Sequence, residues 1–226
     1  MGKLILLRHG QSEWNKRNIF TGWVDIPLSV EGIEESLRAG RKIAHLPIDV
    51  IFTSTLVRAQ TTLFLAMSQH KGGKVPCVIH EEDSRLRDWA GIYNAASEEG
   101  CIPVFTAWEL NERMYGELQG LNKQDTIDRF GAEQVQLWRR SYETAPPEGE
   151  SLSMTAKRTI PYFEKRILPC LKEGKNVFVS AHGNSLRAIV MDLEKLSHAQ
   201  VLALEIGTGE PLIYEYQGGA FHKDKL

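Results

Sequence analysis

Short apolar runs separated by longer segments place the strongest constraint on the fold of this chain. Four of them are rich in β-branched residues and too short for core helices, so we expect buried strands. They lie at residues 4–7, 49–53, 75–79 and 176–181. Strands that are buried on both faces need covering helices, which is typical of parallel sheets. A further run at 211–216 is a candidate for one more strand.

The segments between the runs carry helical patterns. In residues 28–46, Ser29 is placed as an N-cap and apolar residues recur on one helical face. Further helices are expected over 54–70, around Trp138, over 153–172 and over 185–196. This alternation predicts an α/β fold, a three-layer α/β/α domain with a mostly parallel central sheet that spans residues 1–226. Residues 80–107 and 145–151 are expected to be surface loops, which often frame a site.

Charge and cysteine content exclude several classes of protein. The formal net charge of -2 over 226 residues gives no global reason to expect nucleic acid or an anionic membrane as a partner. No run approaches the about 18 apolar residues that span a bilayer, and the N-terminal run is too short for a signal peptide. The widely spaced Cys77, Cys101 and Cys170 suggest neither a disulfide framework nor a zinc site. We therefore expect a cytoplasmic protein with buried free thiols.

A histidine followed by glycine comes at the end of two of the expected strands, as R-H-G at 8–10 and A-H-G at 181–183. Ligands of open α/β sheets bind beyond the carboxyl ends of the strands, so neighbouring strands would bring the two imidazoles together. Such a pair could hold a metal. The H-E-x-x-H and paired CxxC spacings of common metal sites are absent from the sequence, however, and we expect no metal.

Several cationic residues accompany the histidines and indicate a phosphorylated ligand. They are Arg8, Arg58, Lys123, Arg139 and Arg140. Guanidinium groups bind phosphate oxygens in pairs, and a helix that begins at Ser54 would add backbone N–H donors. The chain has no G-x-x-x-x-G-K-[ST] motif, which disfavours a nucleotide-dependent kinase. A neutral imidazole can instead attack phosphorus and form a phosphohistidine, for which His9 is the natural candidate.

Longer sequence blocks are similar to a known superfamily. The chain resembles the histidine phosphatase superfamily in four blocks: R-H-G-Q-S-E-W-N at 8–15, T-G-W at 21–23, S-T-L-V-R-A-Q-T-T at 54–62 and A-H-G-N-S-L-R at 181–187. It resembles the cofactor-dependent phosphoglycerate mutases more specifically in two: E-L-N-E-R-M-Y-G-E-L-Q-G-L-N-K at 109–123 and W-R-R at 138–140. These blocks follow one another over nearly the whole chain.

The resemblance implies a role for each matching residue. His9 would be the phosphorylated nucleophile, and His182 would be its partner, which stabilises the group in transfer. Arg8 and Arg58 would bind that phosphoryl group, and Glu112 would donate and accept the proton. The substrate pocket would be lined by Ser12, Asn15, Thr21, Gly22, Arg113, Tyr115, Lys123, Arg139, Arg140, Gly183 and Asn184.

The reaction that the resemblance implies is the interconversion of 3-phosphoglycerate and 2-phosphoglycerate in glycolysis and gluconeogenesis, primed by 2,3-bisphosphoglycerate. The partners would be these small phosphoglycerates, not nucleic acid or a membrane, and a homo-oligomer is compatible with the resemblance. Two alternatives stay open. One is a phosphatase of the same superfamily acting on small phosphorylated metabolites, in which water accepts the phosphoryl group. The other is a catalytically silent anion-binding module.

Three departures from the family pattern bear on the pocket. Met114 stands where the block usually has histidine. The chain is longer than those relatives around 80–107 and shorter after 145–148. Only ten residues follow Tyr216, where related mutases have a longer mobile tail over the site. We therefore expect detectable phosphatase activity, unless the 80–107 segment folds over the pocket in place of a tail.

Two assignments have competing interpretations. Glu109 lies only three residues before Glu112 and is an alternative proton donor. Trp14, Trp23 and Trp138 are expected to pack in the core and not to contact a ligand.

Overall fold

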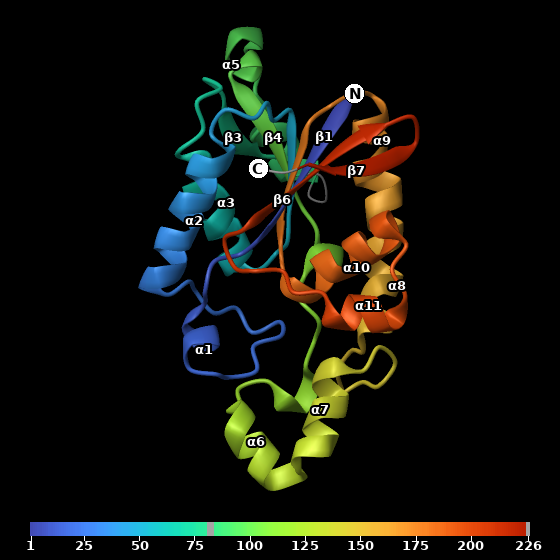
Figure 1. The fold of residues 1–226 in the computed structure, drawn as a ribbon. Helices are drawn as coiled ribbons and strands as arrows, with labels where there is room; N and C mark the ends of the chain where they lie inside the picture. Colours follow the sequence, from blue (N-terminus) through green and yellow to red (C-terminus); the bar gives the residue numbers. More distant parts are fainter. Residues whose placement is uncertain (81–83, 225–226) are drawn as a thin grey trace.

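The computed structural model describes residues 1–80 and 84–224. They form a seven-stranded sheet with the order β3-β4-β2-β5-β1-β6-β7 (Figure 1). The strands from β3 to β1 are parallel, and β6 and β7 are antiparallel. The bounds are β1 Gly2–Arg8, β2 Val50–Thr53, β3 Val75–Val78, β4 Cys101–Thr106, β5 Val177–Ala181, β6 Pro211–Gln217 and β7 Ala220–Asp224. The predicted parallel sheet is confirmed, but β3 lies at its edge with Val75 and Val78 exposed, so the expectation of a buried strand at 75–79 is wrong.

Helices cover both faces of the sheet (Figure 1). One face carries α2 (Val30–Ile43) and α3 (Val57–Met67), and the other carries α8 (Leu152–Tyr162), α9 (Leu168–Lys172) and α10 (Gly183–Glu194). The smaller helices are α1 Glu13–Lys16, α4 Ser84–Trp89, α5 Ala95–Glu99, α6 Lys123–Phe130, α7 Ala132–Arg140 and α11 His198–Ala203. Short turns of helix are η1 Trp108–Leu110, η2 Gly116–Leu118 and η3 Phe163–Ile167. Together these elements make the predicted three-layer α/β/α fold.

β1 shows why the sheet needs helices on both faces. Successive side chains of a strand point to opposite faces of the sheet. Ile5 and Leu7 pack in the cluster beneath α2 and α3, whereas Leu4 and Leu6 pack in the cluster beneath α9 and α10. All four side chains are fully buried, which explains why the run is continuously apolar.

The predicted helices form close to their expected positions. Ser29 caps α2, because its hydroxyl accepts a hydrogen bond from the Gly32 N–H at 3.1 Å. The expected helix over 153–172 consists of α8, the π turn η3 and α9. Pro161 lies inside this stretch and has no backbone N–H to donate, which accounts for the local change in hydrogen bonding. Two helices, α6 and α7, occupy the region around Trp138.

The expectation of a surface loop over 80–107 is wrong. This segment contains α4, α5 and β4, and β4 lies inside the sheet between β3 and β2 with Ile102 and Val104 buried. Pro103 hid the strand in the sequence, since proline argues against an interior strand. α5 lies at the end of the molecule opposite α6 and α7 (Figure 1), while residues 81–83 lie outside the described part.

The C-terminal segment also forms a strand. β7 pairs with β6 at the edge of the sheet, and Phe221 packs against Tyr216 and Phe163 with ring centroids 4.9 and 6.1 Å apart. The three cysteines are free as expected, but they are half-buried and not fully buried. Among the described helices, none combines the length and the apolar character needed to cross a lipid bilayer.

Candidate active site

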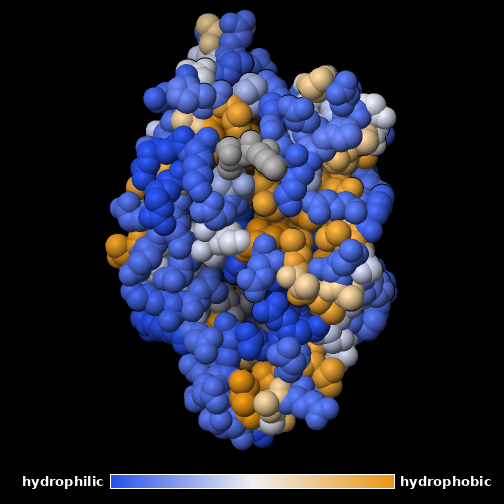
Figure 2. Space-filling view, viewed as in Figure 1, coloured by the Kyte–Doolittle hydropathy of each residue, from blue (hydrophilic) through white to orange (hydrophobic). Residues whose placement is uncertain are grey.

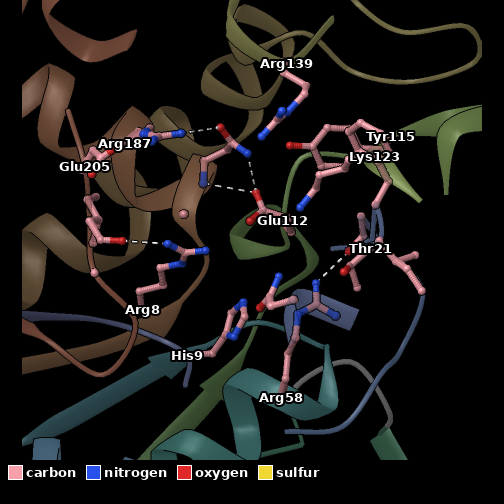
Figure 3. Close-up of a pocket in the computed structure, with 18 of the residues that line it drawn as sticks. Arg8, His9, Thr21, Arg58, Glu112, Tyr115, Lys123, Arg139, Arg187 and Glu205 are labelled. Atoms are coloured by element: carbon pink, nitrogen blue, oxygen red, sulfur yellow. Dashed lines mark hydrogen bonds between the residues drawn. The ribbon is translucent and has the colours of Figure 1, made fainter. Parts of the chain in front are cut away.

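The predicted site residues converge on one pocket beyond the carboxyl ends of β1, β2 and β5. Its volume is about 330 Å³, and Figure 3 shows side chains from the strand ends and from α3, α10 and the segment around Glu112 pointing into it. The lining residues are Arg8, His9, Asn15, Ile19, Phe20, Thr21, Gly22, Arg58, Glu112, Tyr115, Lys123, Arg139, Arg140, Gly183, Asn184, Arg187, Glu205, Ile206 and Gly207. In Figure 2 the hollow is edged by hydrophilic side chains toward α1 and α2, with more hydrophobic groups over α10 and α11.

His9 follows β1 and continues its pairing, because its N–H donates to the Ala181 carbonyl at 3.0 Å. The imidazole is 2% exposed, and its Nδ1 lies 2.7 Å from the Gly10 carbonyl oxygen. A carbonyl only accepts, so Nδ1 carries the proton and Nε2 keeps its lone pair. Burial, followed by the charges of Arg58 and Arg8, holds the pKa of His9 well below its usual range. The site therefore contains a neutral imidazole with a nucleophilic Nε2.

Gly10 is required where it stands. A Cβ at this position would collide with the backbone carbonyl of Gly32, at the start of α2. The Gly10 N–H donates to Thr62 Oγ1 at 3.0 Å, which ties the end of β1 to α3. The close approach of two glycines lets His9 turn directly off the strand into the site.

His182 follows β5 and lies beside His9. Because β1 and β5 are neighbours, the two ring centroids are 4.9 Å apart with an interplanar angle of 61°. The prediction that the two imidazoles meet is confirmed. His182 is fully buried behind His9 and does not line the pocket itself. Burial, then the charges of Arg58, His9, Arg8 and Arg158, lowers its pKa well below the usual range.

One nitrogen of His182 has no partner. Its Nε2 lies 2.7 Å from the Ser54 hydroxyl, which follows β2. Its Nδ1 is buried and makes no hydrogen bond with any described residue, as is true of Arg8 Nε and Thr21 Oγ1. Buried polar atoms without partners are rare in proteins; Arg113 Nε is a fourth one, and of these four residues Arg8 and Thr21 line the pocket.

Two guanidinium groups provide positive charge next to His9. Arg8 donates to the Ile206 carbonyl at 2.8 Å. Arg58 is 1% exposed and donates to the carbonyls of Gly22 and Val24 at 2.7 and 3.0 Å. Burial lowers the pKa of Arg58 to about 10, although Glu112 and Asp25 act to raise it. Since neutral carbonyls hold both groups, their charge stays available for an anion.

The backbone donors expected at Ser54 serve other partners. α3 begins at Val57, whose N–H donates to Asp25 Oδ1 at 2.7 Å. The Thr55 N–H donates to Asn111 Oδ1 at 3.0 Å. Arg58, and not the helix terminus, therefore faces the ligand from this element.

Glu112 is the carboxylate of the pocket. Its Oε1 accepts hydrogen bonds from the Arg113 N–H at 2.7 Å and from the backbone and side-chain amides of Asn184 at 3.1 and 2.9 Å. Burial acts to raise its pKa, but the Arg113 N–H, Arg8, Asn184 and Arg58 together lower it below the usual value. The competing Glu109 borders a different cavity. Glu112 is thus ionised and faces the pocket.

More cations line the pocket on the side of α6, α7 and α10. They are Lys123, Arg139 and Arg187, which Figure 3 labels, and Arg140. Burial, followed by the charges of Arg139 and Arg8, lowers the pKa of Lys123. Arg139 and Arg140 are half-buried, and neither forms an ion pair with any residue in the described ranges. The pocket therefore has a cationic group at each end.

Arg187 and one wall of the pocket were missed by sequence reasoning. Arg187 lies one helical turn after Gly183 in the block at 181–187, a spacing that could have revealed it. Its Nε donates to the Leu204 carbonyl at 2.8 Å, and its Nη1 reaches Asn184 Oδ1 at 3.4 Å. The wall at 205–207 has no sequence signal, because only the packing of α11 brings it to the site.

Two residues predicted to line the pocket lie behind its wall. Ser12 is fully buried and caps α1, where its hydroxyl accepts from the Asn15 N–H at 3.2 Å. Arg113 is also buried, and its Nη2 donates to Tyr115 Oη at 3.0 Å and to the Arg139 carbonyl at 3.1 Å. Both are therefore corrected from ligand contacts to supports of lining residues.

Met114 and the tryptophans contact neighbouring segments. Met114, the departure from the family pattern, does not line the pocket, and its Sδ accepts a hydrogen bond from the Gly116 N–H at 2.8 Å. Trp138 is buried as expected, but Trp14 and Trp23 are only half-buried. Trp23 donates its indole N–H to the Glu112 carbonyl, so the core assignment is wrong for this residue.

Three of the site residues could geometrically hold a cation. Ligand atoms of His9, Glu112 and His182 lie within 4.8 Å of one another, and this is the one such group among the described residues. The adjacent charges of Arg8 and Arg58, which lower the pKa of both imidazoles, act equally against a metal ion. The donor set therefore suits an anion better than a metal.

A family comparison agrees with this geometry. The family described as histidine phosphatase superfamily (branch 1) matches residues 4–92 and 84–226. The chain belongs to the histidine phosphatase superfamily. A 2,3-bisphosphoglycerate-dependent phosphoglycerate mutase of Protochlamydia amoebophila (strain UWE25) is 59% identical over 225 residues and covers 100% of both chains. The 2,3-bisphosphoglycerate-dependent phosphoglycerate mutase 1 of Arabidopsis thaliana is 54% identical, and the match covers 97% of this chain and 66% of the Arabidopsis chain.

Solved structures of the superfamily share the fold. The alpha-ribazole phosphatase from Shigella flexneri has a TM-score of 0.75 and 20% sequence identity, covering 99% of this chain and 95% of its own. The native mycobacterial glucosyl-3-phosphoglycerate phosphatase has a TM-score of 0.73 and 21% identity, covering 99% and 97%. At these identities the likeness concerns the fold alone.

Proposed function

We propose that this protein is a 2,3-bisphosphoglycerate-dependent phosphoglycerate mutase, which interconverts 3-phosphoglycerate and 2-phosphoglycerate. The observation that carries the proposal is the neutral His9, with Nε2 unprotonated, between two guanidinium groups held by carbonyls. Relatives 54–60% identical over nearly the whole chain carry this name. The cations at the other end of the pocket fit the carboxylate and second phosphate of the ligand.

His9 would attack phosphorus through Nε2, so that an N–P bond forms while the O–P bond of the donor breaks. Arg8 and Arg58 would neutralise the non-bridging oxygens, and His182 Nδ1 would donate to one of them. In the phosphorylated enzyme, the ionised Glu112 would take the proton of the acceptor hydroxyl while the N–P bond breaks and a new O–P bond forms, and it would return that proton to the leaving oxygen when His9 is phosphorylated again. 2,3-Bisphosphoglycerate would supply the phosphoryl group that primes His9. Its two phosphates fit a pocket with cations at both ends and buried donors without partners.

The experiment is phosphorylation by 2,3-bisphosphoglycerate, followed by a coupled assay with 3-phosphoglycerate. We expect one acid-labile, base-stable phosphoryl group, and turnover that depends on the added primer. His9→Ala should abolish labelling, whereas His222→Ala, which removes an exposed histidine on β7, should not. Undiminished labelling of His9→Ala would overturn the nucleophile assignment.

The phosphatase alternative retains a specific observation. No described residue of 80–107 or of the C-terminal strand lines the pocket, so the described part of neither segment covers it as a lid. We therefore propose that some phosphohistidine is lost to water, which release of inorganic phosphate in the same assay measures. A catalytically silent binding module is disfavoured, because binding alone does not need an ionised carboxylate beside a neutral imidazole.

We further propose a metal-free reaction in the cytoplasm. Free half-buried thiols and a phosphorylated metabolite as substrate support that location. A homo-oligomer is an expectation that sedimentation of the purified protein would check.

A further inference from the structure

A buried arginine holds the segment that carries Glu112 from behind. Arg158 lies on α8, its side chain is 8% exposed, and it borders a second cavity of about 430 Å³ instead of the pocket. Both oxygens of Glu150 accept from it at 2.8 Å. Its Nη atoms also donate, at 2.8 to 3.3 Å, to the backbone carbonyls of Trp108, Glu109, Asn111 and Glu112. One side chain thus donates hydrogen bonds to four of the five backbone carbonyls of residues 108–112.

The carbonyl of Glu112 is held twice. Arg158 Nη2 donates to it at 2.9 Å, and the Trp23 indole N–H donates to it as well. The guanidinium also lies over the Trp23 ring, 5.4 Å from its centroid. Glu150, bound to Arg158, accepts from the Met114 N–H at 3.0 Å. The backbone is therefore fixed on both sides of Glu112.

Peptide geometry carries this restraint to the carboxylate. In a trans peptide the C=O and the N–H point in opposite directions within one plane. The bond between Glu112 and Arg113 is trans. Because Arg158 and Trp23 hold its carbonyl on one side, its N–H points to the other, where it donates to Glu112 Oε1 at 2.7 Å.

We propose that Arg158 is a positioning residue for the proton transfer, which aims the Arg113 N–H at the Glu112 carboxylate through the peptide between them. This inference rests on the proposed function for its kinetic consequences only. Arg158 forms an ion pair with Glu150 and is not among the groups that shift the pKa of Glu112, although its charge does act on His182, so the effect on Glu112 is one of geometry. The Arg113 N–H is also the main contribution that lowers the pKa of Glu112 against the effect of burial.

Other groups around Glu112 also affect its titration and stay in place in the test. They are Arg8 on β1, Arg58 on α3, His9, His182, Tyr115 and Arg187 on α10. A change confined to Arg158 therefore leaves in place the two charges, Arg8 and Arg58, that shift the pKa of Glu112.

The decisive variant is Arg158→Met, which keeps much of the side-chain volume and removes every donor. We expect kcat to fall about 10²-fold with KM little changed, because misplacement of a catalytic group can cost this much. The acid limb of the pH profile should move to higher pH, since the ionised carboxylate loses a hydrogen bond. Methylguanidinium at millimolar concentration should restore part of kcat in Arg158→Ala, because Arg158 borders the second cavity.

Controls separate positioning from general destabilisation. Lys157→Met changes an exposed neighbour on α8, and Ile167→Val weakens the core farther along the same helical stretch. Both should keep the wild-type pH profile. If Arg158→Met does not fold, Arg158→Lys decides the question. One ammonium group cannot reach all the carbonyls, so this variant should also show the lower kcat and the shift of the acid limb to higher pH.

A direct titration distinguishes failure of this inference from failure of the proposed function. The Glu112 carboxyl signal, followed by ¹³C NMR and identified with Glu112→Gln, should titrate at higher pH in the Arg158 variants whether or not the wild type is a mutase. Unchanged titration and kcat in folded Arg158→Met or Arg158→Lys would overturn the proposal. Absence of labelling and turnover in the wild type would refute the function alone.

Discussion

The neutrality of the buried histidine pair predicts how the stability of the protein depends on pH. His9 and His182 are 2% and 0% exposed, and burial together with neighbouring arginines lowers the pKa of both. In the unfolded chain a histidine has a pKa of about 6.5 and takes up a proton as the pH falls. Acid therefore stabilises the unfolded state relative to the folded state. The stability is fully present above the unfolded pKa and is lost below it.

The magnitude follows from linkage. Between about pH 7.5 and about pH 5.5, a histidine that stays neutral in the folded state lowers the free energy of unfolding by about 1.4 kcal/mol, so the pair lowers it by about 2.7 kcal/mol. Glu112 falls outside this window. Its lowered pKa contributes stability that is lost only as the pH falls below its ordinary value of 4.5.

The assay is urea unfolding of the unphosphorylated protein at both pH values, in a buffer without phosphate. His9→Gln and His182→Gln should each reduce the loss of stability by about 1.4 kcal/mol. His222→Gln, on β7, serves as the control for removal of an exposed histidine. The absolute stability of each variant does not matter, because only its change with pH is compared. If the double variant loses as much stability as the wild type, the two imidazoles are not neutral and the argument for the nucleophile fails.

Three further predictions concern the site and its surroundings. Glu112→Gln should lower the mutase kcat by about 10²–10⁴-fold while Glu109→Gln does not, as steady-state kinetics would show, and equal effects would reassign the proton donor. Activity should survive exhaustive treatment with EDTA, with removal of metal verified by elemental analysis. A loss of activity that Mn²⁺ or Zn²⁺ restores would contradict a metal-free site. Removing residues 221–226 should lower the free energy of unfolding by about 1–2 kcal/mol, because Phe221 packs on the sheet, and should leave the ratio of phosphate release to mutase turnover unchanged. A changed ratio would restore this segment as a lid.

The elements predicted best from the sequence are those whose pattern is local. The runs at β1, β2 and β5 are continuously apolar because both faces of these strands are covered, and this pattern predicts buried strands. Ser29 predicts the start of α2 because its capping hydrogen bond lies within one helical turn. β4 and β7 were missed for opposite reasons. Pro103 interrupts the strand pattern of β4, whereas β7 is an exposed edge with little apolar alternation.

The candidate site divides in the same way. His9 and His182 were found because each follows a strand directly, and strand ends meet at one edge of the sheet. The 205–207 wall depends on how the chain after α11 packs against the site, which no short pattern encodes, whereas the spacing of Arg187 after Gly183 on α10 could have revealed that residue. Ser12 and Arg113 matched the blocks, but the fold turned both behind the pocket wall.

The sequence by itself therefore determined the layered fold, the superfamily and the residue types of the pocket, since periodicity and motifs are properties of neighbouring residues. Only the tertiary structure decided the chemical state of those residues. His9 stays neutral because it is buried beside Arg58 and Arg8, and Glu112 stays ionised because Arg113, Asn184 and two arginines surround it. Protonation depends on burial and on charges brought together from distant segments, and those distances exist only once the chain has folded.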